Sequence, residues 1–252
     1  MNANELLLLL GAGLLAGAMN AVVGGGTFVT LPALTAIGLP GTVANATSTT
    51  ALLPGALTAA WAYRDDMRPV EGVSIRAMSG LSLAGGAVGA GLLLATSEAQ
   101  FALIIPWLLL LATVMLAAGP RLARVLARFG LKAGPGVVLA VQFVLGIYGG
   151  YFGGAVGLMM LAAWSLLSDA DVATLTPLRT LMLAAANAVA VLVFVASGNV
   201  AWLPALVVMA GAVAGGWLGA QVGRRLPPIV LRVLVLAVTV TTTAVFFWRA
   251  YG

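Results

Sequence analysis

Uncharged polar side chains gather at the start of one apolar segment, where residues 45–50 read Asn-Ala-Thr-Ser-Thr-Thr. On a helix, Asn45, Ser48 and Thr49 share a face, because residues three and four apart are neighbours. Hydroxyl and amide donors, together with the free N–H groups of a helix start, suit an oxyanion that must bind and then leave. The alternative is ordinary capping, which favours Ser, Thr and Asn near a helix start. Four hydroxyls in six residues are more than a cap needs.

A single guanidinium stands out further along the chain. Arg179, followed directly by Thr180, is the only charged residue between Asp171 and Arg224. A charged side chain within a membrane helix costs free energy, and we therefore interpret it as a sign of a functional site. Arginine also binds oxyanions with two parallel hydrogen bonds. The alternative is that the Arg179 side chain extends to the membrane surface, because Asp171 lies only eight residues before it.

Two asparagines and two glycine clusters complete the candidate groups. Asn20 and Asn187 are amides in apolar stretches, and either can donate to a substrate or bond to a neighbouring helix. We favour a site role for Asn20, because glycines follow it, and a structural role for Asn187. Glycine turns let backbone amides approach a ligand closely. The candidate substrate-binding residues are Asn20, Gly24, Gly25, Gly26, Thr27, Asn45, Thr47, Ser48, Thr49, Gly153, Gly154, Arg179, Thr180 and Asn187.

The chain lacks suitable residues for several kinds of chemistry. The chain has no cysteine and no histidine, which excludes thiolate chemistry and removes the commonest general base and metal ligand. No Asp or Glu lies well inside an apolar stretch, so a carboxylate proton relay is not visible, although carbonyls and hydroxyls could still hold sodium. An intramembrane enzyme would need a cluster of reactive side chains within the bilayer or at its surface. The acidic pair Asp65–Asp66 does not supply one, because it lies in a short loop without partners. We therefore expect no enzyme activity, cofactor or metal site.

Composition places the chain in a membrane. Hydrophobic residues make up 62% and charged residues 8%, against roughly 25% charged residues in soluble domains. No charged side chain occurs between Glu5 and Arg64, a run longer than two spans of about 20 residues. Such runs must be helical, because lipid offers no partners to backbone amides. The net charge of +5 comes from arginines beside apolar runs, which favours contact with the lipid bilayer rather than nucleic acid.

Glycine motifs recur at nearly constant spacing and divide the chain into two halves. Gly17–Val29 (GAMNAVVGGGTFV) aligns with Gly146–Leu158 (GIYGGYFGGAVGL), and Ala84–Ala90 (AGGAVGA) aligns with Ala214–Ala220 (AGGWLGA). Duplicated, glycine-interrupted halves are typical of secondary transporters, although glycines also occur where membrane helices pack closely. We predict an all-α polytopic fold, with a first repeat at 1–119, a basic cytoplasmic linker at 120–134 and a second repeat at 135–252.

Five helices are predicted in each half. They cover residues 5–23, 27–38, 42–63, 72–96, 99–118, 135–152, 154–168, 173–197, 201–222 and 229–248. The second helix of each half is short and forms either a tight hairpin or a partly re-entrant one with the first. Placing the basic segment 121–132 in the cytoplasm puts nearly all other arginine clusters on the same side and both termini outside. The two repeats then have inverted topology.

The motifs resemble one known family. Gly24–Leu34 (GGGTFVTLPAL) and Leu39–Thr49 (LPGTVANATST) resemble the opening motif of the sulfite exporter TauE/SafE family. Gly149–Trp164 (GGYFGGAVGLMMLAAW) and Leu178–Phe194 (LRTLMLAAANAVAVLVF) resemble its second copy. The resemblance carries the family's motif residues onto Gly24, Gly25, Gly26, Pro32, Asn45, Thr47, Ser48, Gly153, Gly154 and Gly157. The chain departs from the family pattern in having no second-half counterpart of Pro32, and in Arg179–Thr180.

The resemblance implies a multi-pass transporter in the cytoplasmic membrane of a bacterium or archaeon. Its substrate would be sulfite, a sulfonate or a related small sulfur-containing anion, usually moved outward by alternating access around a mid-membrane site. An uptake carrier for a sulfonate or another small anion remains an alternative, as does a non-transporting membrane scaffold. The sequence leaves open the anion, the direction, coupling to protons or sodium, and whether the protein is a monomer or a homodimer.

Overall fold

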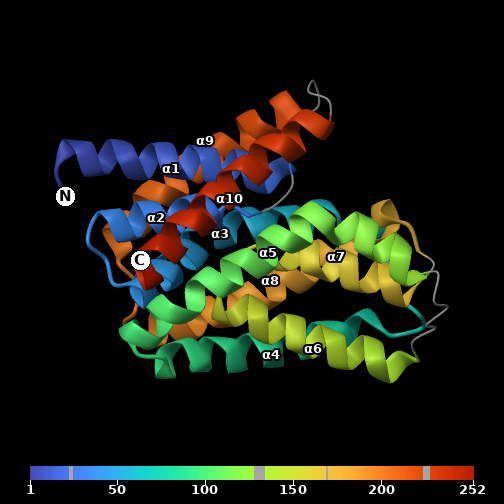
Figure 1. Cartoon of the computed structure of the whole chain (residues 1–252). Coiled ribbons are helices and arrows are strands. Elements are labelled where there is room, and N and C mark those ends of the chain that lie inside the picture. Colours follow the sequence, from blue (N-terminus) through green and yellow to red (C-terminus); the bar gives the residue numbers. More distant parts are fainter. Residues whose placement is uncertain (23–24, 128–133, 169, 224–227) are drawn as a thin grey trace.

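The structure is a computed structural model that describes residues 1–22, 25–127, 134–168, 170–223 and 228–252. These residues form ten α-helices and one short 3-10 turn, and no strand (Figure 1). The elements are α1 (Ala3–Val22), α2 (Thr27–Ala36), α3 (Gly41–Ala62), η1 (Arg64–Asp66), α4 (Ile75–Ala95), α5 (Glu98–Ala127), α6 (Pro135–Tyr151), α7 (Val156–Leu167), α8 (Val172–Ala196), α9 (Trp202–Gly223) and α10 (Pro228–Tyr251).

The all-α prediction with ten helices is confirmed, with one clear difference at the middle of the chain. We expected the fifth helix to end at 118, but α5 continues to Ala127 and takes in much of the predicted basic linker. The helix runs on through Gly119 and Pro120. Arg128 and Lys132 lie outside the described residues. The division into two repeats and a linker stays a prediction.

Six of the described helices are long and apolar enough to cross a membrane. These are α1, α4, α5, α8, α9 and α10, judged by length and composition. The 22-residue α3 is also long enough, but its first half holds the polar cluster at 45–50, which lowers its mean hydropathy. The helices α2, α6 and α7 have only 10 to 17 residues. The protein is therefore a multi-pass membrane protein that combines long spans with short helices.

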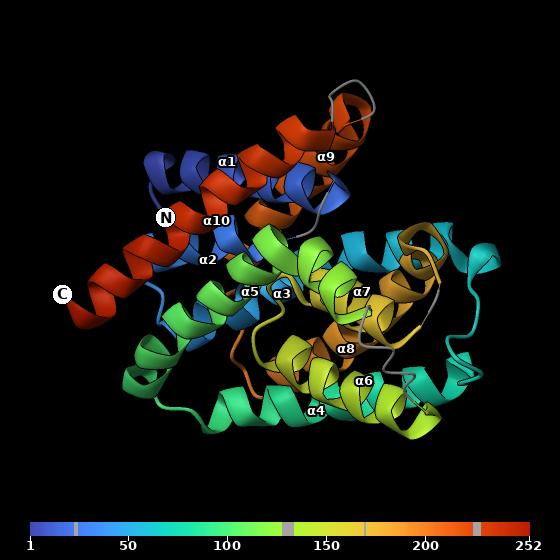
Figure 2. The ribbon, with the colours of Figure 1, turned by 45° about the vertical axis from the view of Figure 1, so that its right-hand side comes forward.

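Two helix hairpins enter the bundle from opposite ends. Both chain termini lie at one end, from which α1 enters and to which α2 returns (Figures 1 and 2). The helices α6 and α7 form a second hairpin that enters from the other end and returns to it. Each hairpin reverses at a glycine with positive φ, +93° at Gly25 and +73° at Gly153, a conformation that a side chain would strain. The rings of Phe28 and Phe152, which lie beside the two turns, pack edge to face with their centroids 6.4 Å apart, so the turns meet inside the bundle.

The first helix of each half packs along the fourth helix of the other half. The pairs are α1 with α9 and α4 with α6. A Cβ at Gly17 would overlap the carbonyl of Ala212, and one at Gly89 would overlap the carbonyl of Ile147. Small residues at such crossings let two helix backbones approach closely in lipid. The glycine motifs that align between the halves are thus also packing partners across them. The inverted orientation of the halves stays a prediction.

Prolines inside the helices release backbone carbonyls, as the sequence suggests. Pro32, Pro54 and Pro177 lie within α2, α3 and α8. Pro32 has no N–H to donate to the Phe28 carbonyl, four residues earlier. The Thr242 hydroxyl of α10 donates to that carbonyl instead, at 3.0 Å. This bond joins the first hairpin to the last helix beside its turn.

Candidate functional site

One cavity of about 480 Å³ lies at the two glycine turns. Its walls come from α1, α2, α3, α7, α8 and α9, which belong to both halves of the chain. Eight of the predicted site residues line it: Asn20, Gly25, Thr27, Thr49, Gly153, Arg179, Thr180 and Asn187. The predicted residue Gly24 lies outside the described residues. The structure thus gathers most of the predicted residues into one space, although they are far apart in the sequence.

The first turn is held by the amide of Asn20. Its Oδ1 accepts a hydrogen bond from the Gly26 N–H at 2.7 Å. A Cβ at Gly26 would lie 2.9 Å from Asn20 Nδ2 and 2.8 Å from the Ala16 carbonyl oxygen, so a larger residue would displace this amide. The bond ties the end of α1 to the start of α2.

The second turn lies between α3 and α8. A Cβ at Gly153 would lie 3.4 Å from Thr49 Oγ1 and 3.9 Å from Asn187 Oδ1. Asn187 is only 7% exposed, and its Oδ1 is buried with no hydrogen-bond partner in the described part of the chain. Buried polar atoms are rarely left unpaired without a reason. Rotation about the last side-chain torsion would present the NH2 group of the same amide to an anion.

Arg179 supplies the charge of the cavity. Its side chain crosses α7 at Gly157, where a Cβ would lie 3.3 Å from Arg179 Cδ. The Nε atom is buried without a partner, and Arg179 forms no ion pair with any acidic residue that the structure describes. None of the described residues that line the cavity is acidic. The stem of Arg179 thus lies in the cavity wall, and the space around it carries one uncompensated positive charge.

The other predicted polar residues of α3 bind neighbouring helices and do not line the cavity. Asn45 Nδ2 donates to the Tyr151 carbonyl of α6 at 2.8 Å. Thr47 Oγ1 accepts from the Ala201 N–H at 3.0 Å, directly before α9. Ser48 Oγ lies 2.5 Å from Thr30 Oγ1 of α2. We call these three contacts the α3 seal; they lie between the cavity and the end of the bundle that holds both termini.

The shared face predicted for α3 therefore has two different environments. Thr49 lines the cavity, whereas Asn45 and Ser48 face α6 and α2. Spacing alone could not separate them, because the two hairpins that pack against α3 come from distant parts of the chain. Gly26 and Gly154 also lie outside the lining. A Cβ at Gly154 would collide with the Phe152 ring, so this glycine serves packing at the turn.

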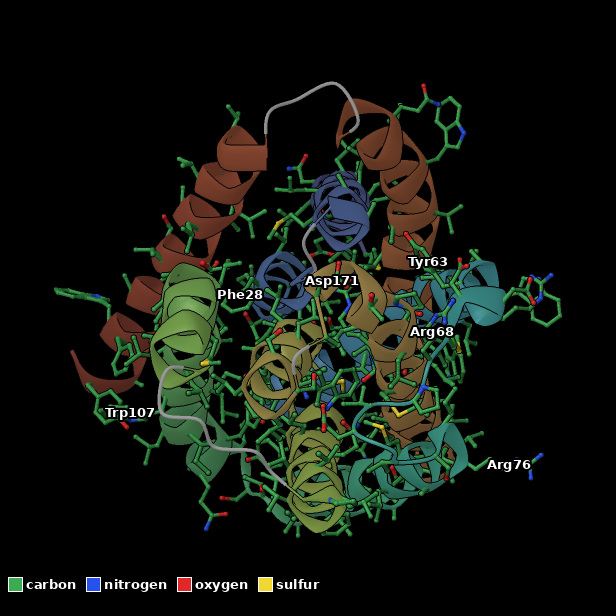
Figure 3. All side chains as sticks on the ribbon, turned by 90° about the vertical axis from the view of Figure 1, so that its right-hand side faces the viewer. Phe28, Tyr63, Arg68, Arg76, Trp107 and Asp171 are labelled. Carbon is green, nitrogen blue, oxygen red and sulfur yellow. The ribbon has the colours of Figure 1, made fainter. Side chains whose placement is uncertain are left out.

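Apolar lining residues were missed from the sequence. The second half of α3 contributes residues from Ala51 to Ala62, and α9 contributes Met209, Ala212, Val213, Gly216 and Trp217. Apolar residues in a membrane helix give no signal that separates a cavity wall from a lipid-facing surface. They extend the cavity from the glycine turns toward the end of the bundle where η1 lies. Figure 3 views this end, with Arg76 projecting away from the helices.

The described residues hold no group of three or more His, Cys, Asp or Glu side chains that could bind a metal ion. The cavity instead offers a guanidinium, amides and hydroxyls at the meeting point of two broken helix pairs. Sites of this kind, at the interface of two halves and beside interrupted helices, are typical of secondary transporters. The fold and the cavity together indicate a membrane transporter.

Residues 9–246 match the model of the sulfite exporter TauE/SafE family, and the chain belongs to this family. A "Probable membrane transporter protein" of Haemophilus influenzae is 27% identical over 246 residues, which cover 95% of this chain and 93% of the relative. The "Probable membrane transporter protein YfcA" of Escherichia coli is 25% identical over 240 residues, with 95% and 88% covered. No solved structure matches the chain. The protein is therefore a membrane transporter.

Proposed function

We propose that this transporter exports sulfite or a related sulfur-containing anion by alternating access, in the cytoplasmic membrane of a bacterium or archaeon. The anion would bind in the cavity between the two glycine turns. One observation carries this proposal: the cavity is lined by both halves, holds the Arg179 side chain, and has no acidic residue among its described lining. An anion is the ligand that such a charge balance favours.

The hydrogen bonds of the cavity indicate which groups would hold the anion. Thr180 Oγ1 donates to the Pro177 carbonyl at 2.7 Å, and Thr49 Oγ1 donates to the Asn45 carbonyl at 3.0 Å. A hydroxyl has one proton to donate, so both threonines already use theirs. The guanidinium of Arg179 and the amide of Asn187 keep free hydrogen-bonding capacity. We therefore assign anion binding chiefly to Arg179 and Asn187, rather than to the hydroxyls of α3.

Alternating access requires the cavity to open first at one end and then at the other. The lining extends toward the end at η1, and the contacts of the α3 seal lie on the opposite side, where we infer that the cavity is closed. With the predicted orientation, the cavity faces the cytoplasm, as it must when an exporter takes up its substrate. Export would then require the α3 seal to open while the walls near Arg179 close.

Counterflow in proteoliposomes tests the proposal. Vesicles loaded with unlabelled sulfite should accumulate external 35S-sulfite when they contain the wild-type protein, because counterflow needs only a carrier that alternates. Arg179→Gln should abolish accumulation, because the charge of the site is lost. Arg76→Gln removes one positive charge from an exposed side chain at the same end of the bundle and should behave as the wild type.

Other results would each contradict part of the proposal. Counterflow of a sulfonate without counterflow of sulfite would keep the carrier and change its substrate. Counterflow of neither anion by well-folded protein would favour the scaffold alternative. Net uptake in intact cells under conditions where export is expected would reverse the direction.

A further inference from the structure

The charge balance of the cavity has a consequence for the empty transporter. Among the described lining residues, Arg179 is the only charged side chain. Arg179 takes part in neither of the ion pairs among the described residues, which are Met1–Glu5 and Arg64–Asp65. The empty cavity therefore carries a charge of +1 that no described side chain neutralises.

Alternating access forces the protein to close around this charge. While the cavity is open, water can solvate the guanidinium. In the closed intermediate that separates the two open states, most of that water must leave. An unpaired buried charge is strongly unfavourable, whereas a paired and hydrogen-bonded one is tolerated. A bound monoanion would supply the pair, and its oxygen atoms could accept from the buried Nε that now lacks a partner.

We propose that this protein is an obligatory anion exchanger, in which the site changes sides only with an anion bound. This inference rests on the proposed function, because it concerns the same site. One monoanion leaves in the first half of the cycle, and a second monoanion must bind from the other side before the site can return. The counter-anion is a small monovalent anion, since one guanidinium balances one negative charge. Each complete cycle moves no net charge.

A carrier that returns empty would need a different site. It could hold an acidic residue that pairs with the arginine when the substrate has left, as buried charges commonly require. The described lining of this cavity contains only hydroxyl, amide and apolar side chains besides Arg179. Its one unpaired amide oxygen, Asn187 Oδ1, can accept a hydrogen bond but cannot neutralise the charge. The substrate itself is therefore the missing counter-ion.

Efflux from proteoliposomes decides between exchange and net transport. Vesicles loaded with 35S-sulfite are diluted into buffer with or without external unlabelled sulfite. The external buffer otherwise contains only the bulky anion gluconate, and a potassium-selective ionophore clamps the membrane potential. We expect efflux to be about 100-fold faster with external sulfite, which corresponds to about 2.8 kcal/mol at about 1.4 kcal/mol per factor of ten. This lies within the range of costs measured for an arginine at the centre of a membrane helix.

Variants of Arg179 show whether the preference for exchange depends on the charge of this side chain. Arg179→Lys keeps the charge and should keep the preference for exchange. Arg179→Gln removes the charge, so any remaining flux should be nearly equal with and without external anion. The matched control Arg76→Gln should keep the wild-type ratio. Exchange of monoanions by the wild type should also be unchanged when the ionophore imposes a membrane potential.

Each result has a distinct meaning. Equal efflux with and without external anion, from wild-type protein that shows counterflow, would overturn obligatory exchange and keep the proposed function. Exchange that accelerates with an imposed potential would overturn the one-for-one charge balance. Absence of counterflow for every tested anion would refute the proposed function, and obligatory exchange with it. If Arg179→Gln fails to fold, the wild-type ratio and its response to potential still decide.

Discussion

The hydroxyl pair in the α3 seal gives a prediction that can be worked out from the structure. Ser48 Oγ and Thr30 Oγ1 lie 2.5 Å apart in a fully buried position. Thr30 Oγ1 has a second partner, because it also donates to the Gly26 carbonyl at 3.3 Å. Ser48 has no other hydrogen bond among the described residues. Removing the Ser48 hydroxyl and removing the Thr30 hydroxyl should therefore change the stability by different amounts.

The two single substitutions should differ in their cost. Ser48→Ala leaves the Thr30 hydroxyl with the Gly26 carbonyl, so we expect a loss of about 0.6 kcal/mol, the average for an interhelical hydrogen bond in a membrane protein. Thr30→Val leaves the Ser48 hydroxyl buried without a partner, so we expect about 1.7 kcal/mol, near the upper end of such measurements. Replacing both hydroxyls removes the unpaired group, and the double variant should lose less than the sum of the single variants.

Reversible unfolding in mixed detergent micelles measures these free energies. Flux into proteoliposomes measures the KM for transport, which reports on the site. Because Ser48 does not line the cavity, the KM of the Ser48→Ala variant should stay within about twofold of the wild type, a free-energy change below about 0.5 kcal/mol. A strictly additive double variant, or a Thr30→Val cost no larger than that of Ser48→Ala, would refute the pairing. A KM that rises tenfold in Ser48→Ala would show that Ser48 contacts the substrate after all.

Three further variants test other parts of the molecule. Gly89→Val should cost more than about 3 kcal/mol of stability, because its side chain would enter the α6 backbone; Gly91→Val, which meets nothing within 4 Å, should fold normally, and detergent-extracted yield with thermal unfolding compares them. Asn187→Ala should raise the KM about tenfold or more, as expected for a lost hydrogen bond to an anion, without lowering the thermal midpoint, because Asn187 Oδ1 has no hydrogen-bond partner among the described residues. Hydrogen bonds from Thr174 hold the pKa of the Asp171 carboxyl below its ordinary value. The ionised Asp171 carboxyl should therefore stabilise the folded protein at pH values above its unfolded-state pKa. This stabilisation should be lost as the pH falls through the lower pKa of the folded state. Asp171→Asn should remove this part of the acid dependence of unfolding, and an equal acid dependence in both proteins would contradict the assignment.

The helices could be predicted from the sequence because lipid permits few alternatives. A run of apolar residues without charges must satisfy its backbone as a helix, and polar or glycine-containing breaks mark its ends. The end of α5 was predicted wrongly for a related reason. The basic residues that follow position 120 suggested a linker, but the helix continues to Ala127, because a basic sequence does not by itself end a helix.

The site was only partly predictable. Arg179 and Asn187 were candidates because polar groups are rare in membrane helices, and both line the cavity, although we favoured a structural role for Asn187 from the sequence. Thr47 and Ser48 carry hydroxyls as Thr49 does, but they bind Ala201, directly before α9, and Thr30 of α2. Which hydroxyl meets the cavity depends on how distant hairpins pack against α3, and one sequence does not record that. The apolar wall on α9 had no signal, since its residues also suit contact with lipid.

The meeting of two hairpin turns inside the bundle changes how the membrane voltage acts on this protein. When water fills the cavity from one side, that solution reaches the lining residues Gly25 and Gly153. The electric field then falls mainly across the closed segment of α3 from Gly41 to Thr49, which at about 1.5 Å per residue is only about 12 Å thick. A rearrangement of this thin layer therefore exposes an ion to nearly the whole transmembrane voltage. The electric potential at the Arg179 guanidinium can therefore change from that of one solution to that of the other while the side chain moves only a short distance.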